Sequence, residues 1–231
     1  AVIAIQDYAG GEKFLRDLYL VSPGATEPRP LTSGGKTRAV FAVSPDGKRV
    51  VFAGARAGKS GLFVLPLDGG EATLLAELPV DADNVRWIGD RVYFTAAVFP
   101  DLGADLAATK KRLEDRAHGP SARVYDDLFF RPWDFWRDGT HNNLFSIDPA
   151  TGRVEAVATG AFDVPLVPFG GREDYQVAPD GTVVYAAKKV PDKAVSTNDD
   201  LFLAARGAAE RRITDNPASD RAPAFSPDGR R

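Results

Sequence analysis

A four-residue turn signal recurs along the chain and does most to limit the folds that it can adopt. The copies read Ser44-Pro45-Asp46-Gly47, Ala178-Pro179-Asp180-Gly181 and Ser226-Pro227-Asp228-Gly229. Pro fixes φ for the first central position of a turn, Asp accepts a bond from nearby backbone, and Gly adopts positive φ, so each copy predicts a tight hairpin. The last two copies lie 48 residues apart and the first two lie 134 apart, close to three such intervals. An interval of roughly 40 to 50 residues is typical of propellers and solenoids.

Short apolar segments of strand composition accompany these turns. Residues 50–53 and 183–187 follow a turn directly, and residues 92–94 follow a weaker copy at Trp87-Ile88-Gly89-Asp90. Further strand-like segments lie at residues 17–21, 61–65, 143–147 and 200–204. A last short strand ends at Leu31-Thr32 and again at Ile213-Thr214. Each repeat is therefore predicted to form four short antiparallel strands, and such a four-stranded sheet is one propeller blade.

We predict an all-β fold, a partial β-propeller of about four to five four-stranded blades with one helix-containing insertion. The predicted blades span residues 1–35 in part, then 36–80, 81–161 and 171–215, and residues 220–231 open another. A blade leaves apolar faces exposed until neighbours pack against it. Because the chain has no methionine and stops just after a turn, we expect 1–231 to be a fragment of a longer propeller.

The third predicted blade is about twice the usual length because residues 98–140 are inserted between its strands. Residues 105–116 have the composition of a short exposed helix. The segment 125–136 that follows is dense in aromatic and charged residues and includes Arg131, Trp133 and Trp136. Loops on a rigid scaffold commonly carry binding groups, so this segment is a candidate binding region.

Composition argues against several classes of function. The net charge is -3, with 29 basic residues scattered among 32 acids, so a nucleic-acid partner has little electrostatic support. No apolar run is long enough to span a membrane as a helix. The chain has no cysteine, which excludes disulfides and thiolate metal sites.

Catalytic signatures are missing from the sequence. There is no G-x-S-x-G elbow for a serine nucleophile, and the two histidines, His118 and His141, stand alone and are expected at turns or on the surface. We therefore expect no catalytic residue, metal or cofactor in this chain. Glu173 and Asp174 follow Pro168-Phe169-Gly170-Gly171 and precede a predicted innermost strand, where a side chain can face a propeller channel. A purely structural role for this pair stays open.

The repeated turn, the phrase Leu62-Phe63-Val64-Leu65-Pro66-Leu67-Asp68-Gly69-Gly70-Glu71 and the Leu31-Thr32 ending together resemble the N-terminal propeller of the prolyl oligopeptidase family of serine peptidases. Residues 125–145 and 163–175 are similar to segments of its dipeptidyl aminopeptidase and acylaminoacyl peptidase branch, especially the type-five dipeptidyl peptidases. The chain departs from that pattern at Pro132, where a His is expected before the Trp, and in its small number of blades.

The resemblance implies a bacterial serine exopeptidase whose Ser-Asp-His triad lies in a C-terminal α/β-hydrolase domain outside this chain. The propeller would gate the active site and select short peptides, in a protein that is periplasmic or cytoplasmic and allows a homodimer. The substrate's ammonium group would need a carboxylate partner, for which Glu173 and Asp174 are the candidates. Trp133, Trp136 and Arg131 would wall the pocket. Packing of the insertion onto the propeller is the alternative use of the two Trp side chains.

A second hypothesis is a non-enzymatic propeller of the TolB type that binds a protein or a polysaccharide. The same hairpins occur in TolB-like propellers, so the repeat alone does not separate the two. Neither hypothesis calls for nucleic acid or a membrane as a partner.

Overall fold

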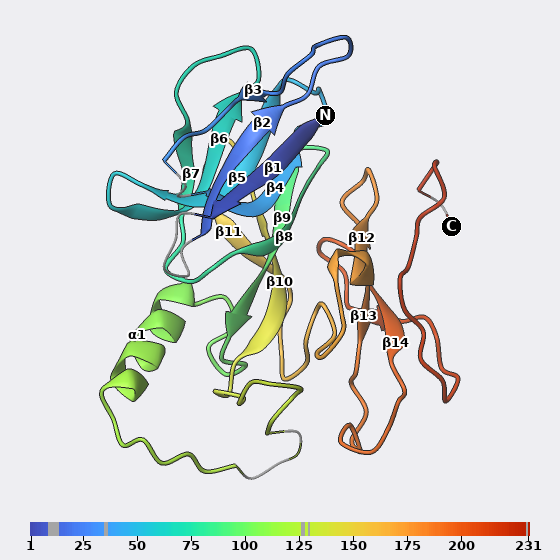
Figure 1. The fold of residues 1–231 in the computed structure, drawn as a ribbon. Coiled ribbons are helices and arrows are strands. Elements are labelled where there is room, and N and C mark those ends of the chain that lie inside the picture. The colour runs from blue at the N-terminus through green and yellow to red at the C-terminus, as the bar shows by residue number, and fades with distance from the viewer. Residues whose placement is uncertain (9–13, 35–36, 126–127, 129, 230) are drawn as a thin grey trace. The chain divides into compact units, whose positions relative to one another are not determined.

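The computed structural model describes residues 1–231 except 9–13, 35–36, 126–127, 129 and 230. The chain divides into two compact units, residues 1–94 with 147–153 and residues 95–146 with 154–231. Within the described residues the strands form four antiparallel sheets of three or four strands (Figure 1). The predicted all-β class with a helix-containing insertion is confirmed.

Two sheets lie wholly in the first unit. One has the order β1-β2-β3, with strands Val2–Tyr8, Phe14–Leu20 and Arg29–Pro30. The other has the order β4-β5-β6-β7, with strands Thr37–Val43, Arg49–Arg56, Lys59–Pro66 and Thr73–Glu77. β5 and β6 pair without a break to Arg56 and Lys59, so the two-residue turn Ala57-Gly58 closes this hairpin, and both turn residues have positive φ.

The Ser44-Pro45-Asp46-Gly47 turn joins β4 to β5 as the sequence predicts. Gly47 N donates to Ser44 O at 2.9 Å and Gly47 has φ 69°, a conformation that favours glycine. The Asp46 carboxylate accepts from the Ser44 hydroxyl and from Lys48 N, and these bonds hold the pKa of Asp46 below its ordinary value. The hydroxyl bond recurs between Ser226 and Asp228, and Gly229 N donates to Ser226 O at 2.8 Å, so both copies of the turn are stabilised by bonds within the turn.

The core of the first unit joins its two sheets. Leu18 of β2 packs with four β5 and β6 side chains, Val50, Phe52, Phe63 and Leu65, and all five are buried. The rings of Phe52 and Phe63 stack with centroids 5.9 Å apart. Val51 and Ala53, which point to the other face of β5, are buried as well, so both faces of this strand are covered.

A threonine hydroxyl fastens the last strand in two of the sheets. Leu18 N donates to Thr32 Oγ1 at 2.9 Å, and Leu201 N donates to Thr214 Oγ1 at 2.9 Å. Each hydroxyl also bonds the carboxylate of the Asp that precedes the Leu. The repeated Leu-Thr and Ile-Thr pairs therefore replace a backbone acceptor where the ladder ends, which satisfies a buried N–H.

The other two sheets complete the described strands. One has the order β11-β10-β9-β8, with strands Val154–Ala158, His141–Ile147, Arg91–Val98 and Asp83–Ile88. The other has the order β12-β13-β14-β15, with strands Tyr175–Val177, Val183–Ala187, Asp200–Ala204 and Arg211–Arg212. In the latter, buried Tyr185 stacks between Phe162 and Phe202, at centroid distances of 6.1 and 5.7 Å.

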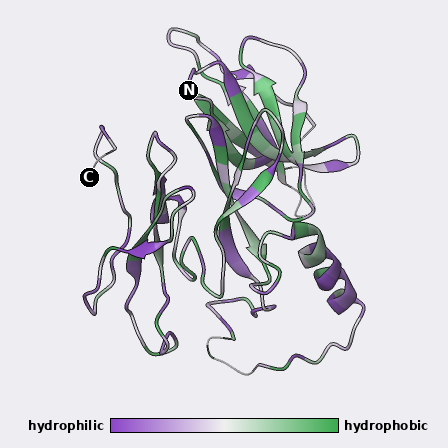
Figure 2. Ribbon diagram, turned by 180° about the vertical axis from the view of Figure 1, so that it is seen from behind, coloured by the Kyte–Doolittle hydropathy of each residue, from purple (hydrophilic) through white to green (hydrophobic). Residues whose placement is uncertain are grey.

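Between β9 and β10 the second unit carries the helix α1, Leu106–Ala117. Asp105 caps its N-terminus by accepting from Ala108 N at 2.9 Å. Lys111 pairs with Asp115 one turn on, and most of the helix is exposed, with only Leu106 and Thr109 buried along it. Figure 2 shows the helix largely in the colour of hydrophilic residues. The short exposed helix predicted at residues 105–116 is confirmed.

Candidate functional site

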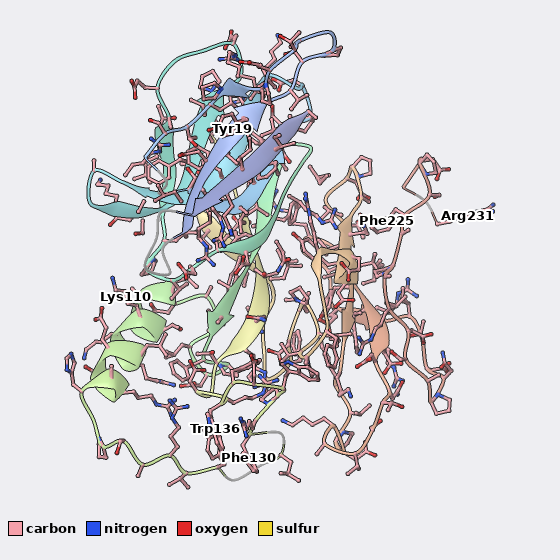
Figure 3. The ribbon with its side chains drawn as sticks, viewed as in Figure 1. Tyr19, Lys110, Phe130, Trp136, Phe225 and Arg231 are labelled. Atoms are coloured by element: carbon pink, nitrogen blue, oxygen red, sulfur yellow. The ribbon has the colours of Figure 1, made fainter. Side chains whose placement is uncertain are left out.

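The aromatic segment after α1 forms a small stack of its own. The Trp136 ring lies 6.0 Å from Tyr125 and 5.8 Å from Phe130, and the Arg131 guanidinium lies over it at 5.2 Å. Figure 3 shows Trp136 and Phe130 beside each other in the segment that follows α1. Trp136 keeps about half of its surface exposed. Arg131 and Trp136, two of the predicted pocket-wall residues, are thus brought together, and Trp133 makes a different contact.

The second predicted segment is built around a tight turn at residues 166–170. Gly170 N donates to Leu166 O at 2.8 Å, and Leu166 N donates to Asp174 Oδ2 at 3.0 Å. A Cβ on Gly170 would collide with the Leu166 backbone and with the Asp174 carboxylate, so this position requires glycine. Leu166 at the start of the turn thus bonds both Gly170 at its end and the Asp174 carboxylate beyond it, and these bonds fix the conformation of the turn.

The two predicted ammonium-binding carboxylates sit in different surroundings on the 3₁₀ helix Arg172–Asp174. Glu173 is exposed, and its carboxylate folds back over Gly171, where an added Cβ would lie 2.5 Å from Glu173 Oε2. Asp174 is buried, and burial raises the pKa of its carboxyl although the bond from Leu166 N opposes the shift. Of the two, Glu173 is available to a ligand, and Asp174 bonds the turn.

Trp133 meets the turn through Phe169. Their ring centroids are 5.2 Å apart in an edge-to-face arrangement. Both side chains are 73% exposed, and both backbones have positive φ, 53° at Trp133 and 72° at Phe169. The contact brings together the two segments, 125–136 and 163–175, that the sequence marks as candidates. The sequence does not indicate that Phe169 contacts Trp133; it shows only that Phe169 precedes Gly170-Gly171.

A buried ionic cluster centres on Asp163, to which the sequence assigns no role. Its carboxylate accepts from Arg137 at 2.8 Å and from Asn142 N at 3.0 Å, and lies 3.1 Å from His141 Nδ1. Burial alone would raise the pKa of Asp163, but the bonds with His141 and Arg137 outweigh it and the pKa is lowered. The surface or turn position expected for His141 is wrong, because its side chain is largely buried on β10; His118 is exposed at the end of α1.

A second buried carboxylate, Asp199, lies near the start of β14. Its Oδ2 accepts from Arg221 Nε at 2.9 Å, from Arg221 Nη2 at 2.7 Å and from the Ser219 hydroxyl at 2.8 Å. Asp199 has 0% exposure, and its Oδ1 has no hydrogen-bond donor within the described residues; Lys188 Nζ lies 3.9 Å away. Arg221 and Ser219 therefore bond one oxygen of the Asp199 carboxylate, and the other oxygen has only the more distant Lys188 ammonium nearby.

These groups border a cavity of about 1300 Å³ in the second unit. Its wall includes Phe169, Asp163, Asp199, and side chains of α1 and of residues 119–125. The predicted residues Arg131, Trp133, Trp136, Glu173 and Asp174 are not among the described lining residues. Seven Lys and Arg side chains and four Asp line it, and the two buried Asp are already bonded by Arg, so the lining is basic.

The described site offers groups that can bind a ligand. Among residues 1–231 less the gaps named above, no three His, Cys, Asp or Glu side chains are grouped to hold a metal ion. Over the same residues, no helix is long and apolar enough to cross a membrane. The cavity combines aromatic and apolar walls at one edge with fixed guanidinium groups, an arrangement that can orient a polar ligand carrying apolar groups.

Comparison with known proteins connects this chain to peptidases. It is 26% identical over 242 residues to the dipeptidyl-peptidase 5 of Porphyromonas endodontalis, an alignment that covers 98% of this chain and 33% of that protein. The chain thus spans about a third of the length of this relative. No protein-family model matches the chain. The resemblance read from the sequence to the type-five dipeptidyl peptidase branch is confirmed.

Solved structures share the fold. The acylaminoacyl peptidase of Pyrococcus horikoshii matches with a TM-score of 0.62 at 14% identity, over 93% of this chain and 30% of that one. A putative TolB from Agrobacterium tumefaciens matches with a TM-score of 0.51 at 16% identity, over 92% of this chain and 60% of that one. At these identities the likeness concerns the fold alone, and it confirms the predicted propeller class.

Proposed function

We propose that this chain, a homologue of dipeptidyl-peptidase 5 along nearly its whole length, is the propeller portion of a serine exopeptidase that releases dipeptides or acylaminoacyl groups from short peptides. The observation that carries the proposal is the extent of that alignment, which covers 98% of the chain rather than one repeat. A shared turn motif alone would align over a single blade.

The proposed role of the propeller is to gate the active site and to select substrates. Its chemistry would come from a C-terminal α/β-hydrolase domain, because this chain has no G-x-S-x-G elbow to hold a nucleophile. The relative is about three times as long as the matched segment, which leaves room for such a domain in that protein. The blade boundaries given above and the place of the hydrolase domain remain predictions.

Within the propeller we propose that Glu173 bonds the ammonium group of the substrate. Its carboxylate is exposed next to the turn whose Phe169 lines the cavity. An ammonium group that leaves water needs an opposite charge, and the cavity lining is otherwise basic. Asp174, buried and bonded to Leu166 N, acts in this proposal by fixing the turn. The predicted pocket-wall role of Trp133, Trp136 and Arg131 stays a proposal for a ligand that extends beyond the cavity, because the described lining does not include these three residues.

The alternative of a TolB-like propeller that binds a protein or polysaccharide is supported by fold likeness only, since the TolB match is 16% identical. The sequence relatives named dipeptidyl-peptidase 5 favour the peptidase hypothesis over it.

The test is hydrolysis by the intact protein. Chromogenic substrates with a dipeptide or an acylamino acid before the cleavable bond should be turned over, and a serine-directed fluorophosphonate should abolish the activity. The chain of residues 1–231 by itself should show no turnover. Absence of activity in the intact protein, or activity in the isolated chain, would overturn the proposal.

A further inference from the structure

Phe169 and Trp133 form an exposed aromatic pair that folding alone does not explain. Each ring is 73% exposed, so burial contributes little to retaining either one. Each residue also has positive φ, which is unfavourable for a bulky side chain. Strained backbone at exposed residues persists where the surroundings enforce it, and such positions cluster at ligand sites.

The surroundings of Phe169 do enforce its conformation. Gly170 N bonds Leu166 O at 2.8 Å, and the buried Asp174 carboxylate accepts from Leu166 N at 3.0 Å. Gly170 has no space for a Cβ. The turn is thus closed by two bonds and by a close backbone approach, and Phe169 has to project away from it.

The Phe169 side chain forms part of the wall of the cavity described above. Phe169 lines the cavity together with Leu166, Val167 and Pro168, so this edge of the wall is apolar. Trp133 contacts Phe169 from outside the lining, at 5.2 Å between centroids and 74° between ring planes. An edge-to-face pair leaves ring surface open for a third apolar group.

We propose that Phe169, which Trp133 contacts from outside the lining, binds an uncharged aromatic or branched aliphatic side chain of a peptide in the cavity, and that Asp174 is the residue that positions Phe169. The peptide as ligand rests on the proposed function. The bound side chain is expected to be uncharged for two reasons. With the Arg137–Asp163 and Arg221–Asp199 pairs set aside, the lining still has more Lys and Arg than Asp side chains, which disfavours a second cation. The apolar edge formed by Leu166, Val167 and Pro168 beside Phe169 disfavours a carboxylate.

The experiment measures binding and turnover separately on the intact protein. Free dipeptides are products of dipeptidyl release and are not cut further, so calorimetric titration with Phe-Ala, Ala-Phe, Ala-Ala, Lys-Ala and Ala-Lys reports affinity alone. One of the two Phe dipeptides should bind the wild type at least five-fold more tightly than Ala-Ala, and both Lys dipeptides should bind more weakly than that one.

Phe169→Gly should abolish this preference while leaving Ala-Ala binding within two-fold, and its Tm should be equal to or above that of the wild type, because the positive φ suits glycine. Phe169→Asn, which also tolerates positive φ, serves as a second variant if the first is unstable. Phe135→Ala is the control, because it removes an exposed ring from the segment 125–136 that lies outside the described cavity lining, and this variant should keep the preference.

The positioning role has its own readout. Asp174→Ala should lose the preference for the Phe dipeptide, and Asp174→Asn, which keeps an acceptor oxygen for Leu166 N, should restore most of it. If the Asn variant behaves like the Ala variant, the positioning role is wrong.

Equal affinity of the wild type for Phe and Ala dipeptides, or an unchanged preference in both Phe169 variants, overturns the aromatic site. Its failure is distinct from failure of the proposed function, because the latter is read from turnover. Selective binding without turnover of any dipeptidyl or acylaminoacyl substrate would support the aromatic site and overturn the exopeptidase.

Discussion

Replacing Asp163 by Asn tests whether the buried ionic cluster holds the second unit together. The Asp163 carboxylate is the shared acceptor for Arg137, Asn142 N and His141, and the side chains of Arg137 and His141 are themselves 20% and 15% exposed. An amide at this position leaves the Arg137 charge without its partner and turns an N–H donor toward other donors. Breaking a buried pair on one side costs about 3 to 5 kcal/mol, and the residual exposure of Arg137 favours the lower end, about 3 kcal/mol.

The expected loss depends on pH in a definite direction. The folded-state pKa of Asp163 is lowered, so its contribution to stability is complete above the unfolded pKa of about 4 and is lost as the pH falls through the folded value. The difference in free energy of unfolding between the wild type and Asp163→Asn should therefore be largest at pH 7 and should shrink toward pH 3.

The assay is urea unfolding followed by tryptophan fluorescence at both pH values, since Trp133 and Trp136 report on the same unit. Asp115→Asn is the matched control, because that aspartate is exposed and its ion pair with Lys111 on α1 is exposed too, and the urea midpoint of this variant should not move. A loss below 1 kcal/mol at pH 7, or an equal loss at both pH values, would refute the reasoning.

Two further changes test other parts of the structure. Glu173→Gln in the intact protein should raise KM for substrates with a free N-terminus about ten-fold or more, with little effect on N-acylated ones, because a neutral amide pairs poorly with an ammonium group; an unchanged KM for the substrates with a free N-terminus would remove Glu173 from the site. Thr32→Val should lower the free energy of unfolding by about 2 kcal/mol, since it leaves the buried Leu18 N–H without its acceptor, whereas Thr32→Ser should recover most of the loss in the same urea assay.

The sheets were predictable because their signals are local. Pro-Asp-Gly sets a hairpin through bonds within four or five residues, as at Ser44 and Arg49, and the short apolar runs of β5 and β6 are buried in the sheet. Helix α1 was predictable for the same reason, since composition and the Asp105 cap act within one or two turns. The predicted helix bounds are within one residue of the observed ones at each end.

The site was predictable only in part, because its contacts join residues far apart in sequence. Asp163 reaches Arg137 and His141 across 26 and 22 residues, and Asp199 reaches Arg221 across 22. The sequence marks the segments 125–136 and 163–175 but not which side chain of each is buried. It therefore treats Glu173 and Asp174 alike, although the turn at Leu166 takes one carboxylate inside and leaves the other in solvent.

The connection between β9 and β10 has a consequence for how such a protein can diversify. β9 ends at Val98 and β10 begins at His141 as its neighbour in the sheet, so the ladder itself holds both ends of the intervening stretch together. Closing a longer loop costs only about 0.6 kcal/mol for each doubling of its length. Helix α1 and the aromatic segment can thus be lengthened, shortened or exchanged with little effect on the strands, and natural variation in ligand preference is free to accumulate there while the sheets stay as they are.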